Sequence, residues 1–128
     1  MKKEVKNWFD SAQYDLETAE HMLSTGRYIY TVFMCHLAIE KVLKAKVEEI
    51  TGKTPPKSHS LRHLLKLANL EPDEKMLEFI SKLSDVSIVT RYPEDFEGLK
   101  KAYDQEMAQK YFKGTKEAFQ WIKQLLSP

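Results

Sequence analysis

The sequence predicts an all-α fold, an antiparallel up-and-down bundle of four long helices and one short helix. Apolar residues recur at intervals of three and four over most of the 128 residues, which is the period of an amphipathic helix. Glycines and prolines fall mainly between these stretches, where helices end. No stretch has the alternating pattern of a strand. A chain of this length is expected to form a single domain, residues 1–128.

The first two long helices are predicted from Lys3 to about Thr25 and from Arg27 to Ile50, with Gly26 ending the first. The apolar residues of the first helix are Val5, Trp8, Phe9, Ala12, Leu16, Ala19 and Leu23. The first half of the second helix is apolar on nearly every side. Such a helix is enclosed by others, so we expect it at the centre of the bundle.

A loop, a short helix and a long helix follow. Residues 51–57 include Gly52 and two prolines, which no helix continues through. Ser58 or Ser60 can cap a short helix that carries the apolar residues Leu61, Leu64, Leu65 and Ala68. The long helix begins near Pro72, and Pro93 requires it to stop at or before Arg91. Its apolar stripe is Met76, Leu77, Ile80, Leu83 and Val86.

The stretch 91–102 is predicted as a loop, after which Asp104 caps the last helix. That helix has two apolar stripes. The first is Met107, Tyr111, Ala118, Trp121, Ile122 and Leu125, and the second is Ala108, Phe112, Phe119 and Leu126. Either the helix packs centrally in the bundle, or its second stripe contacts another subunit.

Composition narrows the possible functions. Twenty basic and nineteen acidic residues give a net charge of +1, so any attraction to nucleic acid must come from a local surface. No apolar run is long enough to span a membrane, and the first residues lack the apolar core of a signal peptide. The single cysteine, Cys35, suits a reducing compartment. We therefore expect a cytoplasmic protein that does not bind membranes.

Catalytic and metal-binding motifs are weak. His59 and His63 are four residues apart, but the glutamate of the H-E-x-x-H zinc motif is missing, and no metal site is predicted. His36 lies four residues before Glu40, which favours a buried histidine satisfied by a carboxylate over a pair of metal ligands. Cys35 is flanked by apolar residues and is expected to be inert. No glycine-rich phosphate loop is present, and no cofactor is predicted.

A binding surface is the stronger hypothesis. The chain has seventeen lysines and three arginines, so Arg91 stands out as a planar donor of hydrogen bonds. If the loop after Arg91 and Tyr92 folds back onto the second helix, these residues join Lys41, Lys44 and Lys46 in a patch suited to a phosphate and a stacked base. From the residues alone the simpler interpretation is favoured, in which Arg91 binds carbonyls at its own helix end and Tyr92 packs under the loop.

Several short motifs occur in an order that resembles the HEPN domain family. They are Trp8 followed by A-x-x-D-L at 12–16, G-x-Y at 26–28, E-K-x-L-K-A at 40–45, H-S-L at 59–61 and R-Y-P at 91–93. The resemblance covers nearly the whole chain. It implies a helical bundle that commonly forms homodimers and is connected with nucleotides or RNA. Some members of the family are ribonuclease toxins, and others are partners of a minimal nucleotidyltransferase.

The sequence departs from the nuclease branch, whose motif is an arginine, four to six residues and a histidine. Neither Arg27, Arg62 nor Arg91 has a histidine at that spacing. We therefore expect a non-catalytic module for nucleotide or RNA association, the accessory subunit of a minimal nucleotidyltransferase in a toxin–antitoxin-like pair. The alternative is an RNA-cleaving toxin with an atypical site that uses His59. The candidate ligand-binding residues are Lys41, Lys44, His59, Arg91 and Tyr92.

Overall fold

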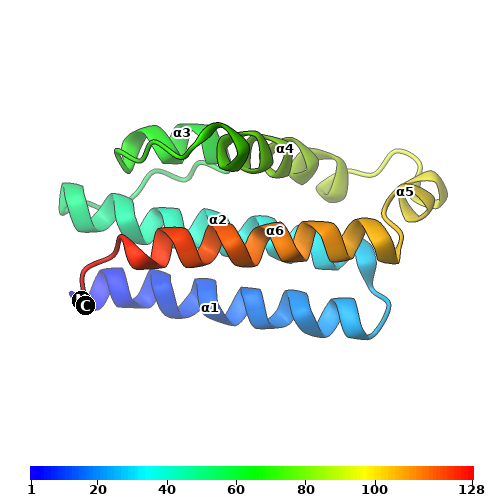
Figure 1. The fold of residues 1–128 in the computed structure, drawn as a ribbon, viewed down its shortest axis with the longest axis horizontal. Helices are drawn as coiled ribbons and strands as arrows, with labels where there is room; N and C mark the ends of the chain where they lie inside the picture. The colour runs from blue at the N-terminus through cyan, green and yellow to red at the C-terminus, as the bar shows by residue number, and fades with distance from the viewer.

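A computed structural model describes residues 1–128, apart from the side chains of Ser87, Thr90 and Arg91. Its centre is α2 (Tyr28–Thr51), which packs against every other helix of the chain. Apolar and polar side chains on nearly all sides of α2 are buried, among them Val32, Ile39, Leu43 and the charged Glu40. The prediction of an enclosed second helix is thus confirmed. In Figure 1, α6 lies in front of α2, α1 runs below it, and α3 and α4 lie above.

The α1 helix (Lys3–Ser24) packs antiparallel along α2 after a tight turn. Gly26 has a φ of 79°, the left-handed conformation that commonly ends a helix. The N–H of Arg27 donates to the carbonyl of Met22 at 2.8 Å, which closes this turn. The two helices are also tied by charge, because Lys41 Nζ lies 2.8 Å from a carboxylate oxygen of the largely buried Asp15.

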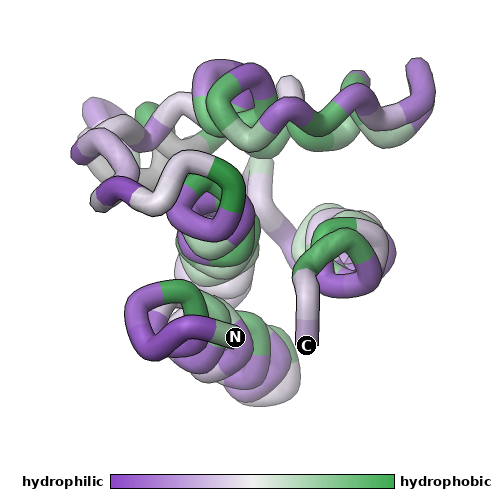
Figure 2. The backbone as a smooth tube through the Cα atoms, turned by 90° about the vertical axis from the view of Figure 1, so that its left-hand side faces the viewer, coloured by the Kyte–Doolittle hydropathy of each residue, from purple (hydrophilic) through white to green (hydrophobic). Residues whose placement is uncertain are grey.

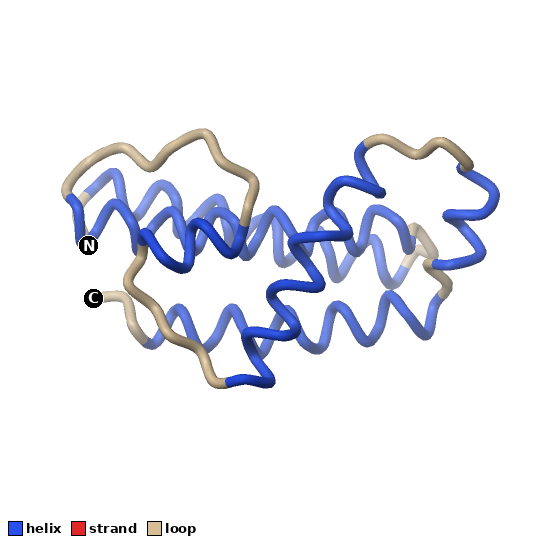
Figure 3. Tube along the Cα trace, turned by 90° about the horizontal axis from the view of Figure 1, so that it is seen from above, coloured by secondary structure: helices blue, strands red, loops and turns tan.

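The two upper helices are α3 (Leu61–Leu67) and α4 (Glu74–Arg91). Ser60, one of the two predicted candidates, caps α3 by accepting the N–H of His63. The N–H of Leu61 donates to Ser84 Oγ at 3.1 Å, and Arg62 makes a two-oxygen contact with Asp85 at 3.0 Å. These contacts join α3 to α4. Seen from above in Figure 3, α4 crosses the other long helices obliquely. The described chain consists of helices and loops.

One short helix was not predicted. The structure has α5 (Phe96–Ala102) inside the stretch 91–102 that was predicted as a loop. Asp95 caps it by accepting the N–H of Gly98 at 3.0 Å, and Leu99 is its buried residue. A seven-residue helix with one buried position leaves almost no periodic signal in a sequence. The bundle therefore has two short helices in addition to the four long ones.

The last helix, α6 (Gln105–Gln124), begins at Asp104, as expected. Its second apolar stripe is buried within the chain, since Ala108, Phe112, Phe119 and Leu126 are all at most 7% exposed. Much of the first stripe is buried as well, because α6 contacts α1, α2 and α4. Of the two alternatives, central packing is therefore correct, and the second stripe does not supply a surface for another subunit.

Both ends of the chain meet at one end of the bundle. The N-terminal ammonium of Met1 donates to the carbonyl of Pro128 at 2.7 Å, and Figure 2 shows the two termini side by side. In that figure, hydrophilic and hydrophobic residues are interspersed along the tube, as expected for amphipathic helices. Among the described residues, no helix combines the length and the apolar character needed to cross a membrane.

Candidate functional site

A row of polar side chains runs along the face of α2 below α3. His36, Glu40 and Lys44 are spaced by four, so they stand above one another on the helix. Glu40 is 4% and Lys44 6% exposed. Lys44 Nζ donates to Glu40 Oε2 at 3.1 Å and lies 5.5 Å from the centre of the Trp8 ring on α1. The lysine is therefore held by a carboxylate and an aromatic face inside the protein.

His59 closes this network from the loop before α3. Its Nδ1 lies 2.9 Å from Glu40 Oε1, so the ring N–H donates to the carboxylate. The backbone carbonyl of His59 accepts from Nε2 of the fully buried His36 at 3.0 Å. A carbonyl only accepts hydrogen bonds, which assigns a proton of His36 to Nε2. We call His36, Glu40, Lys44 and His59 the buried polar network.

The network tests one sequence-based expectation directly. His36 was expected to be buried and satisfied by Glu40. It is fully buried, but its Nδ1 lies 3.7 Å from Glu40 Oε1, beyond hydrogen-bond distance, and its Nε2 binds the carbonyl of His59. His59 differs from His36 because part of its side chain faces solvent. Its side chain is 56% exposed while its Nδ1 is oriented by a buried carboxylate. That arrangement is the one that positions a histidine for proton transfer in many enzymes.

The three lysines of the predicted patch point to three different places. Lys41 contacts Asp15 and Ser11 on α1, and Lys44 belongs to the buried polar network. Lys46 donates to the carbonyl of Leu125 at 2.7 Å, near the C-terminus. The structure therefore does not gather these lysines around a common ligand.

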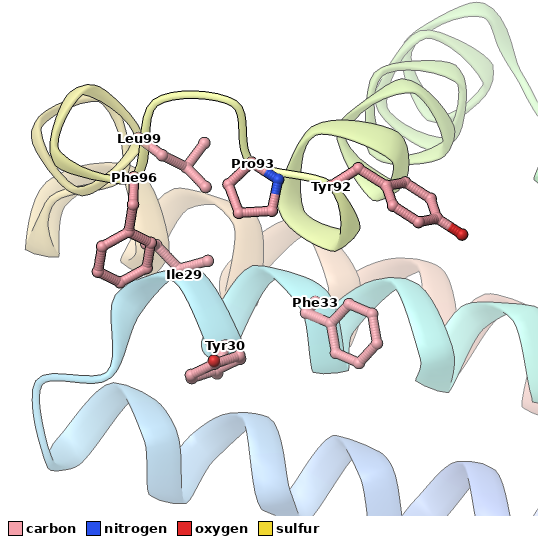
Figure 4. Close-up of a pocket in the computed structure, with 7 residues that line it drawn as sticks. All are labelled: Ile29, Tyr30, Phe33, Tyr92, Pro93, Phe96 and Leu99. Carbon is pink, nitrogen blue, oxygen red and sulfur yellow. The ribbon is translucent and has the colours of Figure 1, made fainter.

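Tyr92 lies at a different place, in a pocket of about 360 Å³ between the start of α2, the end of α4 and α5. Figure 4 shows the seven residues that line this pocket, which we call the aromatic pocket: Ile29, Tyr30, Phe33, Tyr92, Pro93, Phe96 and Leu99. Tyr92 is 75% exposed, so it does not pack under the loop. The side chain of Arg91, the remaining candidate, lies outside the described part of the structure.

A smaller hollow of about 140 Å³ adjoins the aromatic pocket and shares Ile29, Tyr30 and Phe96 with it. Arg27 and Lys100 line this second hollow. The Lys100 ammonium lies 5.3 Å from the centre of the Phe96 ring and 3.0 Å from a carboxylate oxygen of Glu97. Aromatic faces and two cations thus meet at one end of the bundle.

Most residues of the aromatic pocket were missed in the sequence. Its members come from 29–33 and 92–99, two segments that only the fold brings together. A signal was present in the stretch 28–33, where three aromatic residues stand within six positions. Tyr30 among them is 51% exposed, so these aromatic residues exceed what the core contacts of α2 need.

Cys35 is fully buried, and burial raises the pKa of its thiol to about 12. Its thiolate is therefore scarce at neutral pH, which agrees with the expectation of an inert thiol. Among the residues that the structure describes, no group of three or more metal-ligating side chains comes together.

We predict that Glu40→Ala lowers the free energy of unfolding by about 3–5 kcal/mol, because it leaves the Lys44 charge buried without its carboxylate. Urea denaturation measures this loss. The double variant Glu40→Leu, Lys44→Met removes both charges and should be much more stable than Glu40→Ala. His59→Ala, at a half-exposed position, should cost about 1 kcal/mol. Equal stability of Glu40→Ala and wild type would contradict the role of the network.

Comparisons with known proteins agree with the fold. The model of the HEPN domain family matches residues 5–125. The crystal structure of TT1696 from Thermus thermophilus is similar with a TM-score of 0.79 and 24% identity, over 95% of this chain and 98% of that one. The structure of ST0689, an archaeal HEPN homologue, is similar with a TM-score of 0.76 and 24% identity, over 99% and 100%. No curated protein matches the sequence. Since the family model spans nearly the whole sequence, the chain belongs to the HEPN domain family.

Proposed function

We propose that this HEPN domain is a non-catalytic module that binds a nucleotide or RNA in the aromatic pocket. The observation that carries the proposal is the pocket itself, whose exposed rings lie beside the cations Arg27 and Lys100. Aromatic faces stack on unpaired bases, and arginine and lysine bind phosphates. A volume of about 360 Å³ is within the range of small-ligand sites.

The spacing of arginines and histidines supports the non-catalytic part. No arginine of the sequence has a histidine after an interval of four to six residues. Lys44, a candidate for binding a phosphate, is buried and paired with Glu40. In the family, members without the nuclease motif include partners of a minimal nucleotidyltransferase. We propose the same role for this chain, in the cytoplasm and in a toxin–antitoxin-like pair, and co-purification of the native complex tests the partner.

A second candidate function rests on one observation. His59 is exposed and oriented through Nδ1 by Glu40, as a general base would be. RNA cleavage also needs groups that bind the phosphate. The nearest arginine in sequence, Arg62, is engaged with Asp85 and the carbonyl of Ser81. The non-catalytic function is therefore preferred.

We predict that Tyr92→Ala weakens binding of a fluorescent ATP analogue and of a short single-stranded RNA by roughly tenfold, because a stacked base contributes about 1–3 kcal/mol. Fluorescence anisotropy measures both affinities. Tyr14→Ala is the matched control, since Tyr14 is similarly exposed at 71% but lies on α1, outside the pocket. Equal affinities of the two variants would remove the pocket from the proposal.

We also predict that purified protein does not cleave labelled RNA. The comparison is wild type with His59→Ala, prepared in parallel and free of contaminating nuclease. General acid–base catalysis typically contributes 10²–10⁴-fold, so a role for His59 would give a large difference between the two. Cleavage by wild type and none by His59→Ala would establish the alternative function.

A homodimer must form through a surface other than the second stripe of α6, because that stripe is buried within the chain. Ile88 and Val89 on α4 are 67% and 46% exposed, close in sequence to the exposed Tyr92. Such exposed apolar side chains suit a contact between proteins. We predict a mass near twice 15.0 kDa by light scattering at micromolar concentration, reduced to one chain by Ile88→Glu. A wild-type mass of 15.0 kDa would show that the protein is a monomer.

A further inference from the structure

The segment that runs from the end of α2 through α3 carries exposed basic residues and no acidic residue of its own. Between Thr51 and Leu70 the sequence has four basic residues and no acidic residue. The chain as a whole is +1, so the remaining residues have a formal charge of −3. Arg62 of this segment is paired with Asp85 of α4. The other exposed basic side chains, two of them histidines, we call the basic strip: Lys53, Lys57, His59, His63 and Lys66.

The buried polar network holds the backbone that presents this strip. His59 is anchored twice, through its ring to Glu40 and through its carbonyl to His36. Close after it, the N–H of Leu61 is bound by Ser84. Pro55 is buried as well. The loop therefore has a defined position, and its cations are presented on a supported surface, which lowers the entropy lost when a ligand binds.

The side chains around the strip indicate which kind of ligand it takes. Between positions 51 and 70 the structure describes no exposed large hydrophobic residue, and Ile50, 43% exposed, directly precedes the segment. A helix or loop that binds a membrane surface inserts apolar side chains, and protein interfaces are centred on aromatic ones. A surface dominated by cations instead suits the phosphates of a nucleic acid, which are bound without recognition of the bases.

We propose that the basic strip binds the phosphate backbone of RNA, at a place distinct from the aromatic pocket. The strip follows the C-terminal half of α2, where Glu40 holds His59, while the pocket is formed by the first turns of the same helix. Phe33 precedes Glu40 by seven residues, about 10 Å along the helix axis. This inference rests on the proposed function, because it divides RNA binding between a pocket for a base and a surface for phosphates.

The test compares two triple variants of equal net charge. Lys53→Gln, Lys57→Gln, Lys66→Gln removes three charges from the strip. Lys75→Gln, Lys110→Gln, Lys113→Gln removes three exposed charges from α4 and α6. Affinity for a short single-stranded RNA is measured at several salt concentrations, and circular dichroism checks that both variants fold. The strip variant should lose roughly tenfold or more in affinity for RNA. The slope of log K against log salt concentration should be smaller in magnitude by about 2 than for wild type.

The control variant should stay within about twofold of wild type in RNA affinity. Equal losses in both variants would show that net charge alone governs binding and would overturn the proposal. An unchanged affinity of the strip variant would overturn it too. Binding of wild type to phosphatidylserine vesicles through the strip, without binding to RNA, would replace RNA by a membrane surface.

The ATP analogue separates this inference from the proposed function. It is small enough to occupy the aromatic pocket alone, so the strip variant should bind it like wild type, whereas Tyr92→Ala should not. If Tyr92→Ala loses both ligands and the strip variant loses neither, the proposed function stands and the basic strip is wrong. If wild type binds neither the analogue nor RNA, both proposals are wrong.

Discussion

The buried carboxylate of Glu40 is the constraint on which the arrangement of this HEPN domain depends. It accepts from Lys44 on its own helix and from His59 in the loop before α3, and Lys44 in turn lies against Trp8 of α1. A charge in the interior is tolerated only when its partners are in place. The carboxylate therefore anchors the loop before α3 to α2 directly, and it supports the contact of Lys44 with α1. It also explains why a loop with two prolines and no secondary structure has a defined path.

Most of the motifs by which the sequence resembles the family serve as such internal connections. Asp15 of the A-x-x-D-L element pairs with Lys41 of the E-K-x-L-K-A element, and Glu40 of the latter, itself paired with Lys44, binds His59 of H-S-L. Gly26 supplies the left-handed turn between α1 and α2. Residues that recur as a motif are therefore used here for folding. The R-Y-P segment is different, because Tyr92 and Pro93 line an open pocket.

The long helices could be predicted from sequence because each buries a stripe with a regular period, and the caps at Ser60 and Asp104 followed from hydrogen-bonding chemistry. Periodicity could not reveal α5, where one of seven residues is buried. Periodicity also suggested that Lys44 is exposed, as a lysine normally is. Its burial is favourable only because Glu40 and Trp8 lie beside it. The aromatic pocket joins two segments, 29–33 and 92–99, that lie far apart in the sequence and that no local pattern connects.

The distribution of charge shows how a nearly neutral chain can carry a surface that attracts an anion. Uniformly mixed charges produce little field, so a net charge of +1 by itself attracts no polyanion. Here the stretch from Thr51 to Leu70 has no acidic residue, and Glu40, the carboxylate bound to its His59, is buried and engaged with Lys44. That carboxylate orients His59 while exposing little negative charge at the surface. One buried side chain therefore connects the core of α2 to the loop that carries the local positive surface.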